Sequence, residues 1–388
     1  MLKKISATVA ALVIVVAVLF FWLAPTKIER AQNLIIPHAP YKISSEALEL
    51  HRSLFVADLH TDSLLWKRDL LQQSDVGHVD LRRLQSGNVA LQIFSAVTKS
   101  PSGLNTVENT ADSDDITLLS IVQLWPAATW SSLYERARYQ LEKLQDFSEA
   151  SDGALQLVLS KRDLRSLIDA RANGANTVGA IFLIEGAHPL EGKIENLDRL
   201  YEQGMRIVAF THFFDNELAG SLHGVSKAGL TDFGRQVVQR ADELEITIDI
   251  AHASPKSVRE ILALTNRLVI LSHGGVKGVC DTPRNLDDEL MREVAASGGL
   301  LGIGYWVNAI CDVSPTGIVH AIRYAIDLVG VEHVALGSDF DGTVTTPFDT
   351  SELAILTQTM LNKGFTEEEI RKVMGGNAQR FFLESLPD

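Results

Sequence analysis

The segments ITIDIAH (246–252) and LVILSH (268–273) decide the fold, because each is an unbroken apolar run that ends in a histidine. Unbroken runs, rather than alternating ones, are typical of strands buried on both faces of a parallel sheet. Six further segments share this pattern, and helical stretches separate most of them. They are LFVADLH (54–60), VALQIFSAV (89–97), VGAIFLIE (178–185), MRIVAFTH (205–212), LLGIGYW (300–306) and HVALGSD (333–339). Eight strands that alternate with helices predict an α/β fold, a (β/α)8 TIM-type barrel.

One connection in this pattern is too long for a single crossover helix. About 80 residues separate the second and third strands. They include ITLLSIVQLW (116–125) and SSLYERARYQLEKLQDF (131–147), which both read as helices. We therefore expect an inserted helical segment between these two strands.

The amino terminus carries one apolar run that is long enough to cross a membrane. Lys3 and Lys4 precede Ile5–Ala24, which holds no charge over twenty residues. At 1.5 Å per residue this run spans a hydrocarbon core of roughly 30 Å. Its end, Phe20–Leu23, suits a membrane interface better than a signal-peptidase site. We predict an uncleaved single-pass anchor in the cell membrane with the rest of the chain outside the cytoplasm; a cleaved signal peptide is the alternative.

Composition narrows the class of the protein further. The 388 residues are 46% hydrophobic and 22% charged, as in an ordinary globular protein. Their formal charge of −14 argues against a nucleic-acid partner, which would require a basic face. The two cysteines, Cys280 and Cys311, are too few for a disulfide framework; one bridge and two free buried thiols both stay open. We expect a signal anchor over 1–25, a linker over 26–50 and one barrel domain over 51–388.

Six of the predicted strands end in a residue that can bind a metal or move a proton. They are His60, Glu185, His212, His252, His273 and Asp339, and Asp62 follows two residues after His60. In a barrel all carboxyl ends of strands open onto one face, so these side chains meet there. Each one alone has a structural explanation, such as a hydrogen-bonded histidine or a carboxylate at a helix amino terminus. Their joint occurrence predicts one functional site.

The donor set at these strand ends suits zinc and needs no thiolate. His60 and Asp62 lie two residues apart, so they point to the same face of a strand and can bind one ion together. Together with Glu185, His252 and His273 they make five ligands, too many for a single catalytic zinc with an open position. We therefore expect two ions that share one bridging carboxylate, and Glu185 is the candidate bridge.

With these residues assembled, the chain resembles the membrane dipeptidase (renal dipeptidase) family, a branch of the amidohydrolase-like metal barrels, from about residue 50 to 385. The resemblance rests on DLHTD (58–62), IEGAHPLEG (184–192), FTHFFDN (210–216), GLTDFGRQVV (229–238), IDIAH (248–252), LSHGGVKGVCDTPRN (271–285), GSDFDG (337–342) and GGNAQRFF (375–382). It implies a zinc-dependent dipeptidase that hydrolyses dipeptides, including those with a carboxyl-terminal D-residue, by means of a metal-bridging hydroxide.

The resemblance implies that His60 and Asp62 bind the first zinc, that Glu185 bridges, and that His252 and His273 bind the second zinc. It also implies three roles outside the metal ligands. Asp339 transfers protons, His212 polarises the scissile carbonyl, and Arg284 binds the terminal carboxylate of the substrate. A guanidinium fork matches a carboxylate at two points, which supports the last assignment independently. The disulfide-linked homodimer of the family stays open, because this chain lacks the cysteine complement of the animal members.

Two alternatives compete with a dipeptidase. The first is another activity of a binuclear metal barrel, such as an N-acyl-D-amino-acid deacylase or a lactonase. Those relatives commonly have His-x-His on the first strand and a modified lysine as the bridge, whereas this chain has His-x-Asp and Glu185. The second alternative is a degenerate barrel without enzymatic activity, which the complete ligand set disfavours.

A few residues outside this set also receive an assignment. His188 either orients a residue of the metal site or is structural. Asp341 is expected to shape the loop after the last strand, and Asn377 to tie the final helix to the barrel by a buried hydrogen bond. We place the remaining histidines at the surface or in turns: His38, His51, His78, His223, His320 and His333.

Overall fold

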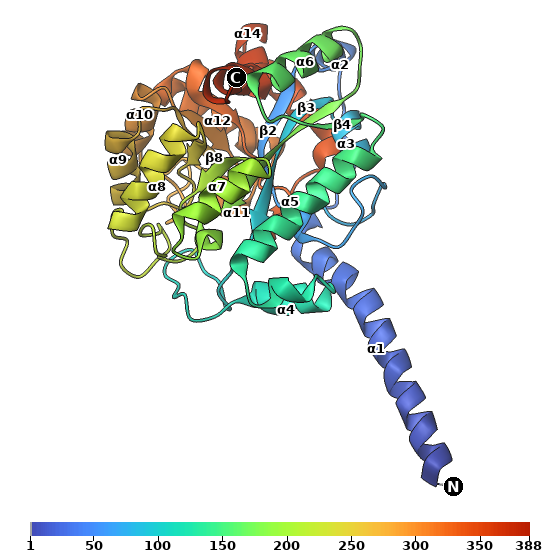
Figure 1. Cartoon of the computed structure of the whole chain (residues 1–388). Coiled ribbons are helices and arrows are strands. Elements are labelled where there is room, and N and C mark those ends of the chain that lie inside the picture. Colours follow the sequence, from blue (N-terminus) through green and yellow to red (C-terminus); the bar gives the residue numbers. More distant parts are fainter. Residues whose placement is uncertain (1) are drawn as a thin grey trace.

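The protein is built around a closed barrel of eight parallel strands (Figure 1). The computed structural model describes residues 2–388, with side chains from residue 11 onward. The barrel strands are β2 (Val56–Thr61), β3 (Val89–Val97), β5 (Val178–Glu185), β6 (Met205–Ala209), β7 (Thr247–Asp249), β8 (Val269–Gly274), β9 (Leu300–Ile303) and β10 (Val334–Leu336). Each pairs with its neighbour in this order, and β10 pairs with β2 to close the ring. The predicted fold class and all eight predicted strands are confirmed.

The predicted insertion between the second and third barrel strands is also confirmed. It contains α4 (Asp115–Val122), the 3-10 helix η2 (Ala127–Trp130), α5 (Leu133–Ala150), β4 (Leu155–Leu157) and α6 (Lys161–Ala172). The short strand β4 pairs with the start of β5. Helix α5 begins where the Ser132 side chain accepts a hydrogen bond from the amide of Glu135, a typical amino-terminal cap.

Helices cover the outside of the barrel. They are α2 (Ser45–Arg52), α3 (Leu81–Ser86), α7 (Ile194–Glu202), α8 (Asp232–Glu243), α9 (Pro255–Leu264), α10 (Asp288–Ala296), α11 (Val307–Ile310), α12 (Pro315–Val329), α13 (Ala354–Asn362), α14 (Glu367–Arg371) and α15 (Asn377–Ser385). Side-chain caps from residues such as Thr231 and Ser314 fix where several of them begin. The Asn377 amide donates hydrogen bonds to the carbonyls of Val331 and Val334, which confirms that this residue ties α15 to the barrel.

The alternation along each strand sorts side chains between the barrel interior and the helical layer. On β2, the buried Leu59 packs in one apolar cluster with Phe381 and Phe382 of α15. Burial of each such side chain stabilises the fold by about 1.5–3 kcal/mol. The next residue, His60, points to the other side, into the barrel. The outward apolar residues thus hold the strand in the register that presents His60 to the site.

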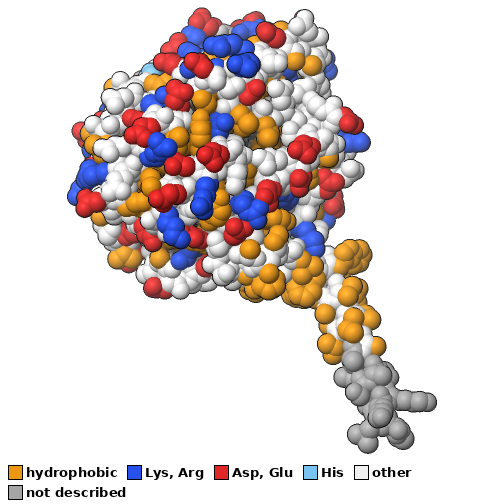
Figure 2. All heavy atoms as spheres, viewed as in Figure 1, with side chains coloured by type: hydrophobic (Ala, Val, Ile, Leu, Met, Phe, Trp, Pro, Cys, Tyr) orange, Lys and Arg blue, Asp and Glu red, His pale blue; other side chains and the backbone are white. Residues whose placement is uncertain are grey.

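A long apolar helix, α1 (Leu2–Gln32), extends away from the body (Figures 1 and 2). The segment Ala11–Gln32, whose most apolar window of 18 residues has a mean hydropathy of 2.3, is long and apolar enough to cross a membrane, although a signal sequence has the same properties. The helix continues through Pro25 and is followed after one residue by β1 (Leu34–Ile35). Strand β1 pairs with β11 (Thr345–Thr346), in the loop that follows β10.

Three of the histidines that the sequence places at the surface or in turns lie in the interior: His51, His78 and His223 are each at most 3% exposed. His78 lies in a bend and His223 in a turn, as the prediction allows, whereas His51 lies in helix α2, so the prediction is wrong for His51. The ring of His51, for example, contacts the Thr357 hydroxyl and the Gly87 carbonyl. These partners come from distant parts of the chain, which is why local sequence did not reveal the burial.

Candidate metal centre

The carboxyl ends of the barrel strands hold the predicted site residues. His60 and His273 lie on β2 and β8, and Glu185 is the last residue of β5. The other members follow their strands within a few residues: Asp62 after β2, His212 after β6, His252 after β7 and Asp339 after β10. All seven side chains are buried. The structure therefore brings together every residue that the sequence assigns to this face.

The Glu185 carboxylate lies at the centre of the group. Its Oε1 is 3.1 Å from Nε2 of His252 and 3.4 Å from Nε2 of His273. Its Oε2 is 3.7 Å from Nε2 of His60 and 3.6 Å from Nε2 of His212. The two oxygens thus face different pairs of imidazoles, which is the arrangement a bridging carboxylate needs.

A second cluster of donors surrounds His60. Its Nε2 lies 3.4 Å from Asp62 Oδ1 and 3.9 Å from Asp339 Oδ1. Three overlapping sets of ligand atoms lie within 4.8 Å of one another: His60, Glu185 and His273; Glu185, His212 and His252; and His60, Asp62 and Asp339. His212 and Asp339, which the resemblance assigns to catalysis, therefore also lie at ligand distance.

The donor atoms in these sets fit divalent metal ions. Two ligands about 2.1 Å from one tetrahedral ion are roughly 3.4 Å apart, which matches the spacings around Glu185. His60 Nε2, Asp62 Oδ1 and Glu185 Oε2 are buried and have no hydrogen-bond partner among the described residues. Such groups are costly to bury without a partner. A cation bound between them would satisfy all three.

Buried negative charge dominates the electrostatics of the site. Burial and the neighbouring Asp62 raise the pKa of Glu185 well above its usual range. Burial also raises the pKa of Asp339, to about 8, although His60 opposes the change. Burial alone would lower the pKa of His60, but the carboxylates of Glu185 and Asp62 outweigh it and raise the value to about 10. The cluster is thus short of positive charge, which bound cations would supply.

Two buried carboxylates, neither of them assigned from the sequence, accept backbone hydrogen bonds at this face of the barrel. Asp58 Oδ1 accepts hydrogen bonds from the amides of His60 and Ser338. Asp249 Oδ1 likewise accepts from the amides of Ala251 and Ser272. The sequence signal for Asp58 is its place two residues before a ligand, on the same face of the strand.

The backbone is unusual at two of the site residues. His252 and Asp339 have φ values of 62° and 61°, in the left-handed region that non-glycine residues seldom occupy. Non-glycine residues held in this region cost about 1–3 kcal/mol each and are concentrated at functional sites. Here the turn aims both side chains back over the barrel mouth.

Arg284 lies at the edge of the metal centre, as the sequence predicts. It is buried, donates a hydrogen bond of 2.9 Å to the carbonyl of His273, and stacks over the Trp306 ring at 5.5 Å from the ring centroid. Burial lowers the pKa of this guanidinium, and the charges of Asp339 and Glu185 oppose the change. The side chain is thus a fixed cation beside the donor cluster.

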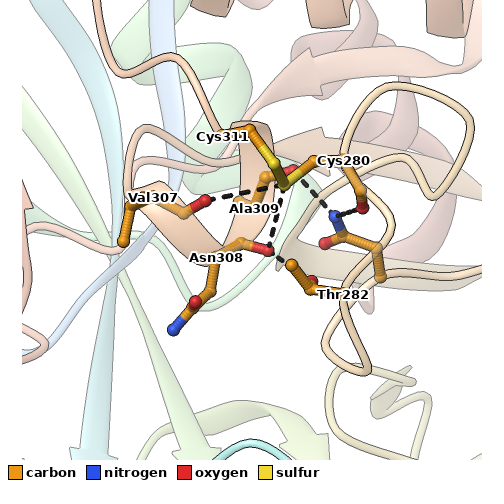
Figure 3. The surroundings of a disulfide bond; sticks show 7 residues. Cys280, Thr282, Val307, Asn308, Ala309 and Cys311 are labelled. Carbon is orange, nitrogen blue, oxygen red and sulfur yellow. Dashed lines mark hydrogen bonds between the residues drawn. A yellow bond between two sulfur atoms is a disulfide. The ribbon is translucent and has the colours of Figure 1, made fainter.

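A disulfide bond braces the loop that carries Arg284 (Figure 3). Cys280 is bonded to Cys311, so the bridged one of the two states left open by the sequence is the correct one. The Thr282 hydroxyl donates to the carbonyl of Asn308 at 2.6 Å, and the Asn285 amide donates to the carbonyls of Cys280 and Ala309. The loop is therefore fastened to helix α11 and the turn that follows it.

A cavity of about 170 Å³ opens over these residues. Asp62, Glu185, His273, Arg284 and Asp339 supply polar side chains to its lining. This volume is far above the roughly 10–15 Å³ that one water molecule needs and below the ~300 Å³ of pockets for drug-sized ligands. The cavity suits a small substrate.

Comparison with known proteins agrees with this geometry. Residues 44–385 match the family model described as membrane dipeptidase, peptidase family M19. The chain belongs to the membrane dipeptidase family. It is accordingly a hydrolase of the metallopeptidase class, and the resemblance stated from its motifs is confirmed.

Two curated dipeptidases illustrate the similarity. Dipeptidase verJ of Clonostachys rogersoniana is 24% identical over 352 residues, covering 87% of this chain and 85% of that protein. Dipeptidase 3 of Mus musculus is 26% identical over 364 residues, covering 88% of this chain and 67% of that protein.

Solved structures share the fold of this membrane dipeptidase family member. A metallopeptidase from Rhodobacter sphaeroides, solved with a phosphinate mimic of the dipeptide L-Ala-D-Ala, superposes with a TM-score of 0.72 at 22% identity. The alignment covers 86% of this chain and 99% of that one. An amidohydrolase from Pseudomonas aeruginosa gives a TM-score of 0.68 at 20% identity, over 88% of this chain and 99% of that one.

Proposed function

We propose that the protein is a dipeptidase that holds two zinc ions and hydrolyses dipeptides, including those with a D-residue at the carboxyl end. The observation that carries the proposal is the Glu185 carboxylate, whose two oxygens face separate pairs of imidazoles. The dipeptide mimic bound by the related Rhodobacter sphaeroides enzyme supports the substrate class.

Five residues would bind the metal ions. His60, Asp62, Glu185, His252 and His273 would hold the ions, with Glu185 between them. Two divalent ions bound there would polarise a carbonyl and lower the pKa of water. The protein's own residues would then orient the substrate and move its protons.

Three side chains of this chain would handle the substrate. The Asp339 carboxylate, at the cavity wall, would take a proton from the attacking water and return it to the leaving amine nitrogen. The His212 ring would donate a hydrogen bond from Nε2 to the carbonyl oxygen as that oxygen becomes negative, an interaction worth about 3–4 kcal/mol at the transition state. Because Nδ1 faces the carbonyl of Lys99, this donation requires the protonated ring. Arg284 would bind the terminal carboxylate through two parallel hydrogen bonds.

The test is metal content and substrate profile measured on the full-length protein in detergent. We expect about two zinc ions per chain and turnover of both L-Ala-L-Ala and Gly-D-Ala. Glu185→Gln should lose metal and activity together, whereas Glu202→Gln, at an exposed position on α7, should retain both. Hydrolysis of N-acetyl-D-alanine or a lactone in place of dipeptides would favour a related barrel activity. A protein that stays metal-free and inert after zinc is added would overturn the proposal.

We also infer that α1 anchors the barrel to the cell membrane, with the barrel outside the cytoplasm. Its apolar surface is largely unburied within the protein, since only 6% of the most apolar window is buried. The Cys280–Cys311 bond supports an oxidising compartment. Carbonate extraction of membranes tests the anchor, protease treatment of intact cells tests the side, and the mass of the mature chain distinguishes an anchor from a cleaved signal.

A further inference from the structure

The exposed hydrophobic side chains of the body are concentrated at one end of the barrel. Outside α1, the large hydrophobic residues that the structure describes as exposed are Leu34, Ile36, Leu104, Val107, Leu118, Leu124, Trp130, Val225, Leu264 and Val307. All except Leu264 belong to segments that follow the carboxyl end of a barrel strand or pair with such a segment. Leu264 ends helix α9, at the opposite end. Isolated apolar residues are common on protein surfaces, but a one-sided distribution is not.

The inserted segment α4–η2 contributes the largest share of this surface. Leu118, Leu124 and Trp130, here called the rim patch, are 65%, 57% and 41% exposed. The inner side of the same helix contributes Ile116 to the wall of the substrate cavity. Helix α4 is therefore apolar on both sides, although only one side packs against the protein.

Helix α4, which carries Leu118 of the rim patch, lies beside α1. Ile28 of α1 packs against the apolar cluster that includes Trp125, and Leu119 of α4 packs against the same cluster. Figure 2 shows hydrophobic side chains along the edge of the body where α4 lies in Figure 1, continuous with the apolar surface of α1. The two apolar surfaces thus form one continuous face.

The body of the protein reaches the end of the apolar run of α1. The Lys67 ammonium donates to the carbonyl of Phe21 at 3.4 Å, so the body reaches the level of Phe21 and Trp22. In a membrane-spanning helix, aromatic residues at the end of the apolar run lie at the headgroup level. Trp130 and the two leucines of the rim patch would lie at this level as well.

We propose that the rim patch is a second membrane contact, which inserts into the interface of the lipid bilayer and turns the barrel mouth toward the membrane. The proposal rests on the inferred anchorage by α1. A bilayer is favoured over a second copy of the chain because the patch is continuous with the apolar surface of α1. Apolar side chains with an aromatic member are typical of protein segments that lie in a membrane interface.

Fluorescent labels on the full-length protein in liposomes test this contact. Both native cysteines are in a disulfide, so a new cysteine can be labelled selectively. The labelled variants are Leu118→Cys and Leu124→Cys in the rim patch, Leu19→Cys in α1, and Arg165→Cys on α6 as the control. Lipids that carry a quencher near the headgroup report which labels contact the membrane. We expect the labels at 118 and 124 to be quenched about twofold or more beyond the label at 165, as for an interfacial segment.

Each outcome decides between the hypotheses. Quenching at 19, 118 and 124 but not at 165 supports the second contact. Quenching at 19 alone overturns it and leaves the anchor intact. The absence of quenching at 19 overturns the anchor and the second contact together. A blue shift at 118 without lipid quenching, reversed when the protein is diluted in lipid, would show that a second copy covers the patch and would also overturn the proposal.

The matched double variant Leu118→Ser/Leu124→Ser adds a functional readout. We expect it to retain dipeptide turnover in detergent, since both side chains point away from the cavity. In the same liposomes, a label at Trp130→Cys should lose its lipid quenching on this double-variant background. Unchanged quenching there would contradict an insertion that depends on the two leucines.

Discussion

The Ser272 hydroxyl oxygen lies 2.9 Å from Nδ1 of His273 and 3.3 Å from Nδ1 of His60. If both rings bind metal through Nε2, their Nδ1 atoms carry the protons and the hydroxyl accepts from both. One side chain thus fixes the orientation and tautomer of two proposed ligands on neighbouring parts of the site. Such orienting partners typically contribute a factor of about 10–100 to metal affinity.

We therefore expect Ser272→Ala to bind zinc roughly 10- to 100-fold more weakly than the wild type. Competition with a chelator of known affinity measures the change. Ser297→Ala, whose hydroxyl donates to the Val294 carbonyl at the end of α10, is the control and should bind normally. Unchanged zinc affinity in Ser272→Ala would show that the two histidines are held by other contacts.

Arg284→Ala should raise the KM for dipeptides about 10- to 100-fold, because a charged hydrogen-bonding partner of the substrate carboxylate is removed. The KM for the matching dipeptide amides, which lack this carboxylate, should change little. Arg284→Lys keeps the charge but loses the fork, so an intermediate KM is expected. Thermal unfolding of each variant controls for loss of structure. Equal losses on acids and amides would argue against carboxylate binding by Arg284.

Removal of the disulfide should both destabilise the fold and loosen the loop that carries Arg284. The bridge closes a sequence separation of 31 residues, for which chain entropy predicts a contribution of about 3–4 kcal/mol. We expect Cys280→Ser/Cys311→Ser to lose this amount in urea unfolding and to show a higher KM with a smaller change in kcat. Reduction of the wild type should reproduce both effects. An unaltered unfolding midpoint would mean that the hydrogen bonds of Thr282 and Asn285 hold the loop unaided.

The lowered pKa of Lys143 should make the stability of the fold depend on pH. Burial, followed by repulsion from Arg68, lowers the pKa of this lysine from 10.5 to about 7 in the folded protein. Between these two values the unfolded chain binds a proton that the folded chain does not, so stability rises with pH across this window. Lys143→Met should flatten the rise in urea unfolding measured at pH 7, 8 and 9. Lys363→Met, at an exposed position, is the control and should leave the slope of stability against pH unchanged. If Lys143→Met has the same slope as the wild type, Lys143 stays charged in the folded protein.

The sequence predicts the barrel and its site because both depend on local patterns. An unbroken apolar run needs no knowledge of its neighbours to indicate a buried strand, and the residue that ends it must lie at the barrel mouth. The features that were missed depend on contacts between distant segments. His78 is isolated in a polar stretch, and its ring faces the Leu34 carbonyl and the amide of Asp341. The partner of β1 is likewise set by the loop after β10, which carries no pairing signal of its own.

The carboxylate of Asp341 shapes that loop as expected, through hydrogen bonds with the Ser63 hydroxyl and the amide of His78. The same carboxylate also pairs with Arg68, which in turn pairs with Glu29 of α1. The sequence does not predict these ion pairs. No periodic pattern links these positions in the sequence. His188, whose role was left open, stacks on Phe214 and contacts the Asn216 amide, so the structure shows packing contacts for it.

Only Asn33 separates α1 from β1, and its side-chain oxygen accepts a hydrogen bond from the amide of Thr343 at the cavity wall. The proposed anchor is therefore joined to the barrel by a short, hydrogen-bonded connection and not by a flexible linker. Helices that are too long for a thin bilayer tilt to shorten their span. Because this connection is short, a tilt of α1 would also tilt the barrel. The thickness of the bilayer would then set the angle between the entrance of the barrel and the membrane, and so the direction from which substrate approaches.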